Sequence, residues 1–235
     1  MGYVTSGSSE LSSTRPIAGP PFQETAANNF RLFRQRLSQK NDALSIVLVG
    51  PRSSSQNCPT GEGGLALNQP GLREAPDTIS LTSSSFSEGG HLLQQYAATS
   101  IGGKDISPPL AWSNLPPGTL ELVLILEDPD APICFAPIHL VASNIPPSPS
   151  SLPEGALCKG AQGQALILGK GTFGRFGYHG PRPPNGHGPH KYIFQIYALG
   201  KALSCPRTSS LKTIIPAMAG HVLARGTLTG IFERV

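Results

Sequence analysis

The stretch from Tyr178 to Leu199 reads YHGPRPPNGHGPHKYIFQIYAL and joins two kinds of local structure. Its first half cannot form a helix, because its four prolines lack amide donors and fix φ while its glycines loosen the chain. From Tyr192 onward, apolar side chains occupy both alternating faces, which is typical of a strand covered on both sides. A stiff loop that leads into a buried strand predicts a small rigid pocket where the two meet.

The composition favours a loop-rich, mainly β protein over a helical bundle. The 235 residues include 24 Pro and 27 Gly, and only 14% of the residues are charged. No apolar run approaches the ~20 residues that a membrane-spanning helix needs, and residues 1–20 lack the apolar segment of a secretory signal. We therefore expect a soluble cytoplasmic protein without a transmembrane segment. The four cysteines are widely spaced and form no C-x-x-C pair, so we expect reduced packing residues.

Residues 1–75 are predicted to be a low-complexity, largely disordered extension that precedes a domain at 76–235. Ser, Gly and Pro dominate residues 6–13 and 52–64, which lack the apolar residues needed for a core. Between them, apolar residues at helical spacing with arginines on the other faces predict a short amphipathic helix near 25–39.

Three interpretations of that helix remain open. It is an organelle-targeting segment, a helix that binds a partner or a membrane surface, or a helix packed on its own domain. The acidic residues Glu10 and Glu24 weaken the targeting interpretation, and we favour the packed helix.

From Asp77 onward, short apolar segments alternate with turn signals about every ten residues. This pattern predicts an antiparallel β-sandwich with one or two small helices. The expected strands are 78–86, 110–112, 120–126, 139–145, 192–199 and 226–232, and the expected helix is 209–223, kinked or divided by Pro216.

The charges are distributed unevenly along the predicted domain. Nine Lys or Arg residues and no acid lie between Gly155 and Phe232, which makes this half attractive to an anion. These basic residues are singly spaced, and the aromatic residues among them fit core positions, so we do not expect nucleic-acid binding.

Polar side chains next to Pro or Gly at strand ends are the candidates for chemistry. Asp128 and Asp130 follow the strand at 120–126, His139 opens another strand, and His187 and His190 lie in the Pro/Gly loop. Metal binding by the two loop histidines with Asp128 is disfavoured, since the loop cannot supply the helical spacing of common zinc sites. The sequence GKGTFG at 169–174 resembles a kinase glycine loop, but the other kinase motifs are missing, so we interpret it as a turn.

In combination these motifs resemble the phosphatidylethanolamine-binding protein family, also called Raf kinase inhibitor-like proteins. The resemblance rests on DPDAP at 128–132, on His139, and on the pattern Y-x-G-P-x-P-P-x-G-x-x-x-H-K-Y that begins at Tyr178. The sequence GHVLARG at 220–226 is similar to the bacterial-type branch. The resemblance covers about residues 76–235.

The resemblance implies a β-sandwich whose pocket binds an anion, such as the phosphate of a phospholipid head group or a phosphorylated side chain, without a cofactor or a metal. It places seven residues at the pocket: Asp128, Asp130, His139, Gly180, Pro183, His190 and Tyr192. His187 is left as a surface histidine. Leu140 stands beside the strand histidine, where family members often have an aromatic residue, so the pocket wall is expected to differ.

These observations favour a non-enzymatic binding protein, which by analogy with the family regulates a protein kinase or protease by direct contact. No nucleophile with an adjacent base and no G-x-S-x-G motif is evident. The alternative is a hydrolase of small esters or phosphoesters in which Asp128 or Asp130 acts with His139 or His190. A third hypothesis treats the pocket as vestigial and assigns partner binding to the helix near 25–39.

Overall fold

The computed structural model describes residues 61–161, 166–206 and 209–235. These residues belong to one compact unit that runs from Ser55 to Val235. The helix predicted near 25–39 lies outside the described residues.

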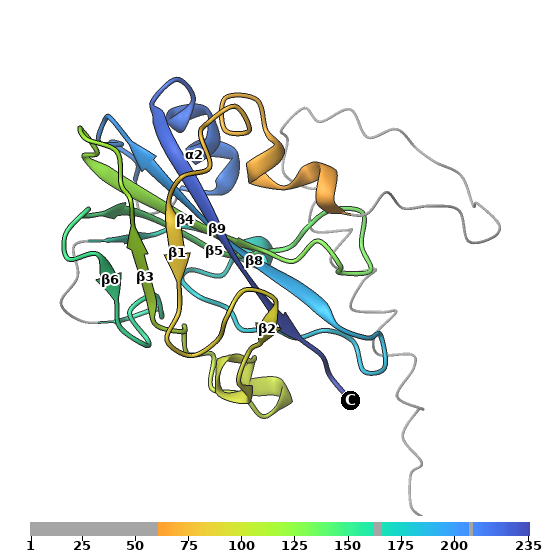
Figure 1. The fold of residues 1–235 in the computed structure, drawn as a ribbon. Helices are drawn as coiled ribbons and strands as arrows, with labels where there is room; N and C mark the ends of the chain where they lie inside the picture. The colour runs from red at the N-terminus through yellow and green to blue at the C-terminus, as the bar shows by residue number, and fades with distance from the viewer. Residues whose placement is uncertain (1–60, 162–165, 207–208) are drawn as a thin grey trace, which may run out of the picture. The chain divides into compact units, whose positions relative to one another are not determined.

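The described chain is mainly β, as predicted, with one α-helix and several short 3₁₀ segments (Figure 1). The strands are β1 (Ser80–Thr82), β2 (Gly90–His91), β3 (Leu110–Ser113), β4 (Glu121–Glu127), β5 (Ile138–Ile145), β6 (Ser151–Leu152), β7 (Ile167–Leu168), β8 (His190–Leu199) and β9 (Val222–Phe232). The helix is α2 (Leu211–Met218), and the 3₁₀ segments are η1 (Gly61–Gly64), η2 (Ala66–Asn68), η3 (Gln94–Tyr96), η4 (Thr99–Ile101) and η5 (Thr172–Gly174).

The strands form two sheets with a hydrophobic core between them, which confirms the predicted sandwich. The larger sheet has the order β2-β9-β8-β4-β5-β7, and the smaller has the order β1-β3-β6. All named pairs are antiparallel except β2 with β9. Leu81 and Trp112 of the smaller sheet belong to the same buried cluster as Leu124 and Phe194 of the larger one.

A second core covers the opposite face of the large sheet. Val123, Ile125 and Tyr197 point into it, and Ile214 and Met218 of α2 pack against them. Because β4 and β8 are covered on both faces, their sequences are nearly continuous apolar runs. This is the pattern from which buried strands were predicted.

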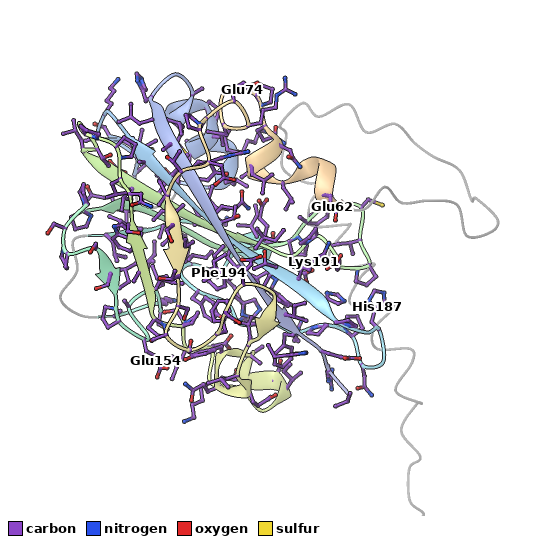
Figure 2. The ribbon with its side chains drawn as sticks, viewed as in Figure 1. Glu62, Glu74, Glu154, His187, Lys191 and Phe194 are labelled. Carbon is purple, nitrogen blue, oxygen red and sulfur yellow. The ribbon has the colours of Figure 1, made fainter. Side chains whose placement is uncertain are left out.

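The segment before residue 76 contributes to this second core. Ala66 and Leu72 are completely buried in it, and Lys191 of β8 forms an ion pair of 2.9 Å with Glu62 of η1 (Figure 2). Residues 61–75, which precede the predicted boundary at 76, therefore include apolar side chains that are buried against the large sheet.

Two element boundaries differ from the sequence expectation. The helix ends at Met218 rather than near 223, because Gly220 adopts a left-handed φ of 77° and Val222 already belongs to β9. The first predicted strand shrinks from 78–86 to the three residues of β1, since its serines turn the chain back through side-chain hydrogen bonds such as Ser83 Oγ to the Pro109 carbonyl.

No helix in the described ranges combines the length and apolar character needed to cross a membrane. Cys158 and Cys205 are free thiols, as expected, but Cys134 is disulfide-bonded. The expectation of reduced cysteines is wrong for Cys134.

A buried polar network fastens η2 to the large sheet. Glu127, 1% exposed, accepts hydrogen bonds from the Ala66 amide at 2.8 Å and from Gln195 Nε2 at 2.7 Å. Gln195 Oε1 accepts from the Leu67 amide and from the Tyr197 hydroxyl, each at 2.8 Å. Burial raises the pKa of Glu127 even though both hydrogen bonds favour its charged form.

Replacing Gln195 with Leu tests this network. We expect Gln195→Leu to lower the free energy of unfolding by about 2–4 kcal/mol, since it strands the Leu67 amide, the Tyr197 hydroxyl and part of Glu127 in a buried site. Urea unfolding measures the change. Gln94→Leu is the matched control, because Gln94 is exposed and its side chain makes one hydrogen bond, to the Ile101 carbonyl. Equal losses in the two variants would contradict the assignment.

Candidate functional site

The pairing of β4 brings the predicted polar residues to one end of the large sheet. β4 is antiparallel to both of its neighbours, and Glu127 is paired with Ile138 of β5 and with Ile193 of β8. The carboxyl end of β4 therefore lies beside the amino ends of both neighbouring strands. Asp128, His139 and His190, which are far apart in the sequence, meet at that end.

A cavity of about 170 Å³ opens at this position. Five of the seven predicted site residues line it: Asp128, His139, Pro183, His190 and Tyr192. The other lining residues are Ala131, Pro132, Ile133, Pro137, Ile138, Thr172, His179, Arg182 and Pro184. Prolines and short apolar side chains thus form most of a rigid wall around a few polar groups, a combination typical of small-ligand sites.

His190 and Asp128 form a buried pair in the cavity wall. The distance from His190 Nδ1 to Asp128 Oδ2 is 2.9 Å, and the side chains are 1% and 5% exposed. Since the carboxylate can only accept, Nδ1 of His190 carries a proton. His190 Nε2 lies 2.9 Å from Nδ1 of His187. His187 is exposed, as predicted, yet it contacts a pocket histidine at the outer end of the loop (Figure 2).

His139 is fixed in a definite tautomer. Its Nδ1 donates to the His179 carbonyl oxygen at 2.7 Å, so in the neutral ring Nε2 has no proton. Burial lowers the pKa of His139, and the His179 carbonyl and nearby carboxylates oppose this effect only in part. The ring lies edge-on to Tyr192 with centroids 5.2 Å apart and stacks on His179 at 5.7 Å. These contacts hold His139 as a neutral, oriented proton acceptor.

Tyr192 contributes a buried hydroxyl to the cavity. The residue is 0% exposed, and its hydroxyl makes no hydrogen bond of good geometry to the described residues. Burial, and then the nearby charge of Asp128, raise its pKa, so the hydroxyl keeps its proton. A buried hydroxyl without a hydrogen bond of good geometry is the kind of group that a polar ligand satisfies.

Asp130 and Gly180 lie outside the cavity lining and have structural contacts. Asp130 Oδ2 accepts from the Lys191 amide at 2.8 Å, so its carboxylate fixes the turn against β8. A side chain at Gly180 would place Cβ 2.4 Å from the Tyr96 carbonyl oxygen, so only glycine fits there. Their assignment as ligand-binding residues remains a prediction.

Three polar lining residues were absent from the predicted site: Thr172, His179 and Arg182. Arg182 was the easiest to find, because it is the only cation within the Pro/Gly loop that precedes His190. Thr172 belongs to the glycine-rich turn at 169–174, where its Oγ1 accepts from the Ile138 amide at 2.7 Å. This hydrogen bond fixes the turn beside the pocket. Leu140 is buried in the core between the sheets and does not line the cavity.

The fold and the cavity define a β-sandwich protein with a small, histidine-lined pocket at one end of its large sheet. Residues 82–233 match the phosphatidylethanolamine-binding protein family. A UPF0098 protein of Pyrococcus horikoshii is 44% identical over 135 residues, which cover 56% of this chain and 67% of the relative. A UPF0098 protein of Aquifex aeolicus is 39% identical over 154 residues, covering 65% of this chain and 86% of the relative.

Solved structures agree with the sequence comparison. A phosphatidylethanolamine-binding protein homologue from Chlamydia trachomatis superposes with a TM-score of 0.60 and 35% identity over 68% of this chain and 99% of its own. YbcL of Escherichia coli, described as a member of the mammalian family, gives a TM-score of 0.63 and 28% identity over 67% of this chain and 99% of its own. The chain belongs to the phosphatidylethanolamine-binding protein family, as its motifs predicted.

His179 makes the stability of the domain depend on pH. Burial, followed by the neighbouring His139 and Arg175, lowers the pKa of His179 from 6.5 to about 4, and Asp105 opposes the shift. Between these values the unfolded chain binds a proton that the folded chain excludes, so stability falls as the pH falls. We expect about 2 kcal/mol less stability at about pH 5 than at about pH 8.

Urea unfolding at the two pH values measures this difference, and His139 adds a change of the same sign. His179→Gln should show a clearly smaller loss on acidification, whereas His91→Gln, which changes an exposed histidine, should behave as wild type. An unchanged loss in His179→Gln would show that another group is responsible.

Proposed function

We propose that the pocket binds a phosphate-bearing small molecule or lipid head group without turning it over. The observation that carries this proposal is the convergence of the His139 ring, the Asp128–His190 pair and the Tyr192 hydroxyl on one cavity, with Arg182 in its wall. The volume of about 170 Å³ suits a single phosphate group with a short substituent and excludes a bulky ligand from complete burial.

Each polar group has a defined part in such binding. The Tyr192 hydroxyl donates to a phosphate oxygen, and Arg182 supplies a positive charge with several donors. His139 Nε2 accepts the proton of a phosphate monoanion or, once protonated, donates to the dianion. Asp128 would repel a phosphate at close range, so its part is to hold the His190 ring, and a head-group amine is the one ligand group that it would attract.

The finer parts of the proposal rest on the family. A phospholipid head group and a phosphorylated side chain present the same chemistry to this pocket, so a kinase or protease partner carrying such a group would reach the same residues. The seven predicted residues remain the proposed ligand set, with Arg182 and His179 added from the cavity lining. A location in the cytoplasm remains a prediction.

A titration with phosphoethanolamine, followed by NMR of the histidine rings, tests the pocket. We expect shifts of His139 and His190 in the wild type, and binding at least about tenfold weaker in His190→Ala, which removes one wall group and leaves Asp128 unpaired. His91→Ala is the matched control, because His91 is exposed and lies outside the cavity lining. Equal binding by wild type and His190→Ala would remove His190 from the site.

One observation favours hydrolysis as the second candidate. The buried Asp128–His190 pair is the arrangement that orients a general base. Against it, the hydroxyls in the cavity lining belong to Thr172 and Tyr192, and neither is hydrogen-bonded to a histidine. A hydrolase that used the Asp128–His190 pair would therefore have to activate a water molecule as its nucleophile.

Assays with a panel of acyl esters and phosphoesters separate the two functions. The binding proposal expects no turnover above that of heat-denatured protein, in the wild type and in Asp128→Asn alike. Turnover by the wild type that Asp128→Asn lowers by about 100-fold or more would establish the hydrolase instead.

A further inference from the structure

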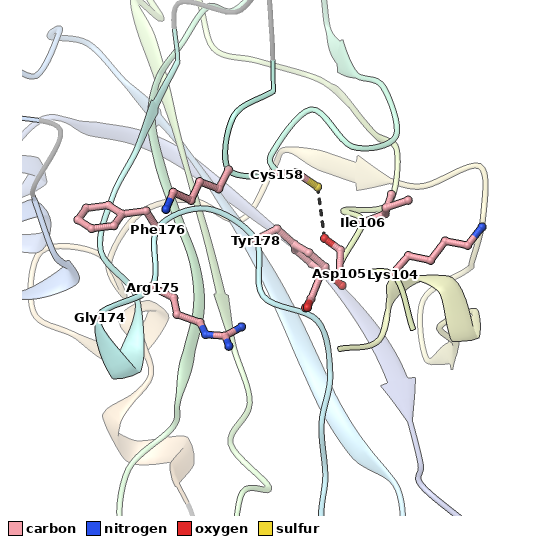
Figure 3. Close-up of a pocket in the computed structure, with 9 residues that line it drawn as sticks. Lys104, Asp105, Ile106, Cys158, Gly174, Arg175, Phe176 and Tyr178 are labelled. Atoms are coloured by element: carbon pink, nitrogen blue, oxygen red, sulfur yellow. Dashed lines mark hydrogen bonds between the residues drawn. The ribbon is translucent and has the colours of Figure 1, made fainter. Parts of the chain in front are cut away.

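A second and larger cavity of about 570 Å³ is lined by Tyr178, the residue before His179 of the first pocket. Its wall is built from the loop after η4, from the residues around Cys158, and from the chain that follows η5 (Figure 3). The lining residues are Lys104, Asp105, Ile106, Cys158, Lys159, Gly174, Arg175, Phe176 and Tyr178. No residue lines both this cavity and the first pocket.

Three cations line this cavity, and none has an acidic partner among the described residues. Lys104, Lys159 and Arg175 are exposed, and they form no ion pair in the described part of the chain. Figure 3 shows Arg175 and Lys104 on opposite sides of Asp105 and Tyr178. The three cations therefore repel one another across the cavity, and a bound anion would lower this repulsion.

The single acid in the wall is already occupied. Asp105 accepts hydrogen bonds from the Gly180 amide at 2.8 Å and from the Thr99 amide and hydroxyl at 3.2 and 3.1 Å. These bonds, together with His179, lower the pKa of Asp105 despite its partial burial. Its carboxylate is charged and held against the backbone, and the three lysine and arginine side chains outnumber it, so the lining carries a net positive charge.

Arg175 has an unusual partner for an arginine. Its Nη1 lies 2.9 Å from Nδ1 of His179, and the same Nδ1 lies 3.2 Å from Asp105 Oδ1. The arginine contact needs a lone pair on Nδ1, whereas the carboxylate contact needs a proton there. The two contacts cannot both be satisfied, so Arg175 is held weakly and is available to a better acceptor.

The apolar part of the wall limits the kind of anion. Ile106, Phe176 and Tyr178 contribute apolar surface to the lining, and Tyr178 is buried with its hydroxyl donated to the Tyr96 carbonyl at 2.9 Å. The aromatic rings and the aliphatic side chain suit a flat or short apolar body, while the cations suit a phosphate or carboxylate group.

We propose that this cavity is a second binding site, for a small anion that carries an apolar body, and that Arg175 leaves His179 to bind the anionic group. Lys159 and Lys104 complete the charge around the anion, and Phe176 contacts the apolar body. His179 then keeps Asp105 as its only charged partner, with Nδ1 as the donor. The other charged or titratable group facing His179 is His139, whose ring stacks on it.

Phenyl phosphate is the probe. Inorganic phosphate, which lacks the apolar body, and benzylamine, which has an apolar body but a positive charge, are the controls. Backbone NMR shifts around Arg175 measure binding, and mass spectrometry measures alkylation of Cys158, which the ligand should protect. Cys205, a free thiol outside the cavity lining, is the internal control. We expect phenyl phosphate to bind more tightly than inorganic phosphate, and benzylamine not to bind.

Variants separate this site from the first pocket. Arg175→Gln with Lys159→Gln should weaken phenyl phosphate at least about tenfold and abolish the protection of Cys158. Lys212→Gln changes an exposed lysine of α2, and His190→Ala disrupts only the first pocket. Both variants should keep the binding of phenyl phosphate and the protection of Cys158. The proposal is overturned if Cys158 is not protected in the wild type, or if the double variant protects it equally.

The ¹⁵N shift of His179 Nδ1 gives a second readout. On saturation with phenyl phosphate, it should move toward the value of a protonated nitrogen, since Arg175 no longer donates to it. Saturation without such a change would show that Arg175 stays on His179, and it would overturn this part of the proposal.

Discussion

The antiparallel pairing of β4 with both β5 and β8 is the constraint on which the pocket depends. It buries β4 completely between two cores, and it also determines which loops meet at the end of the sheet. The polar groups gather there because the ladder stops at Asp128, where proline-rich segments replace paired strands. Strand direction thus determines where the pocket forms, and its residues come from separate segments of the sequence.

The central strands, the sandwich and the family could be predicted because their signals are local. Continuous apolar runs mark buried strands, and the DPDAP and Pro/Gly motifs are dense in residues with few conformations. Other features depended on tertiary contacts. The attachment of η2 rests on the buried Glu127 and Gln195, which accept hydrogen bonds from the Ala66 and Leu67 amides, and polar side chains in an apolar run give no sign of such partners.

The same distinction applies to the sites. Asp128, His139, His190 and Tyr192 were found through motifs, whereas His179 and Thr172 enter the pocket only because their loops fold back onto it. The second cavity was invisible in the sequence for a similar reason: Lys104 lies more than fifty residues before its other two cations, Lys159 and Arg175. The uneven charge of the carboxyl half was the one available hint. His179 lines the first pocket, and its ring contacts Arg175 of the second cavity, so this contact connects the two.

The contact between His187 and His190 has a consequence for proton movement. His190 is almost inaccessible, but its Nε2 touches a histidine that faces the solvent. A chain of two imidazoles can pass a proton by exchanging donor and acceptor roles. The His190 ring can therefore exchange protons with the bulk solution through His187, even while a ligand occupies the pocket.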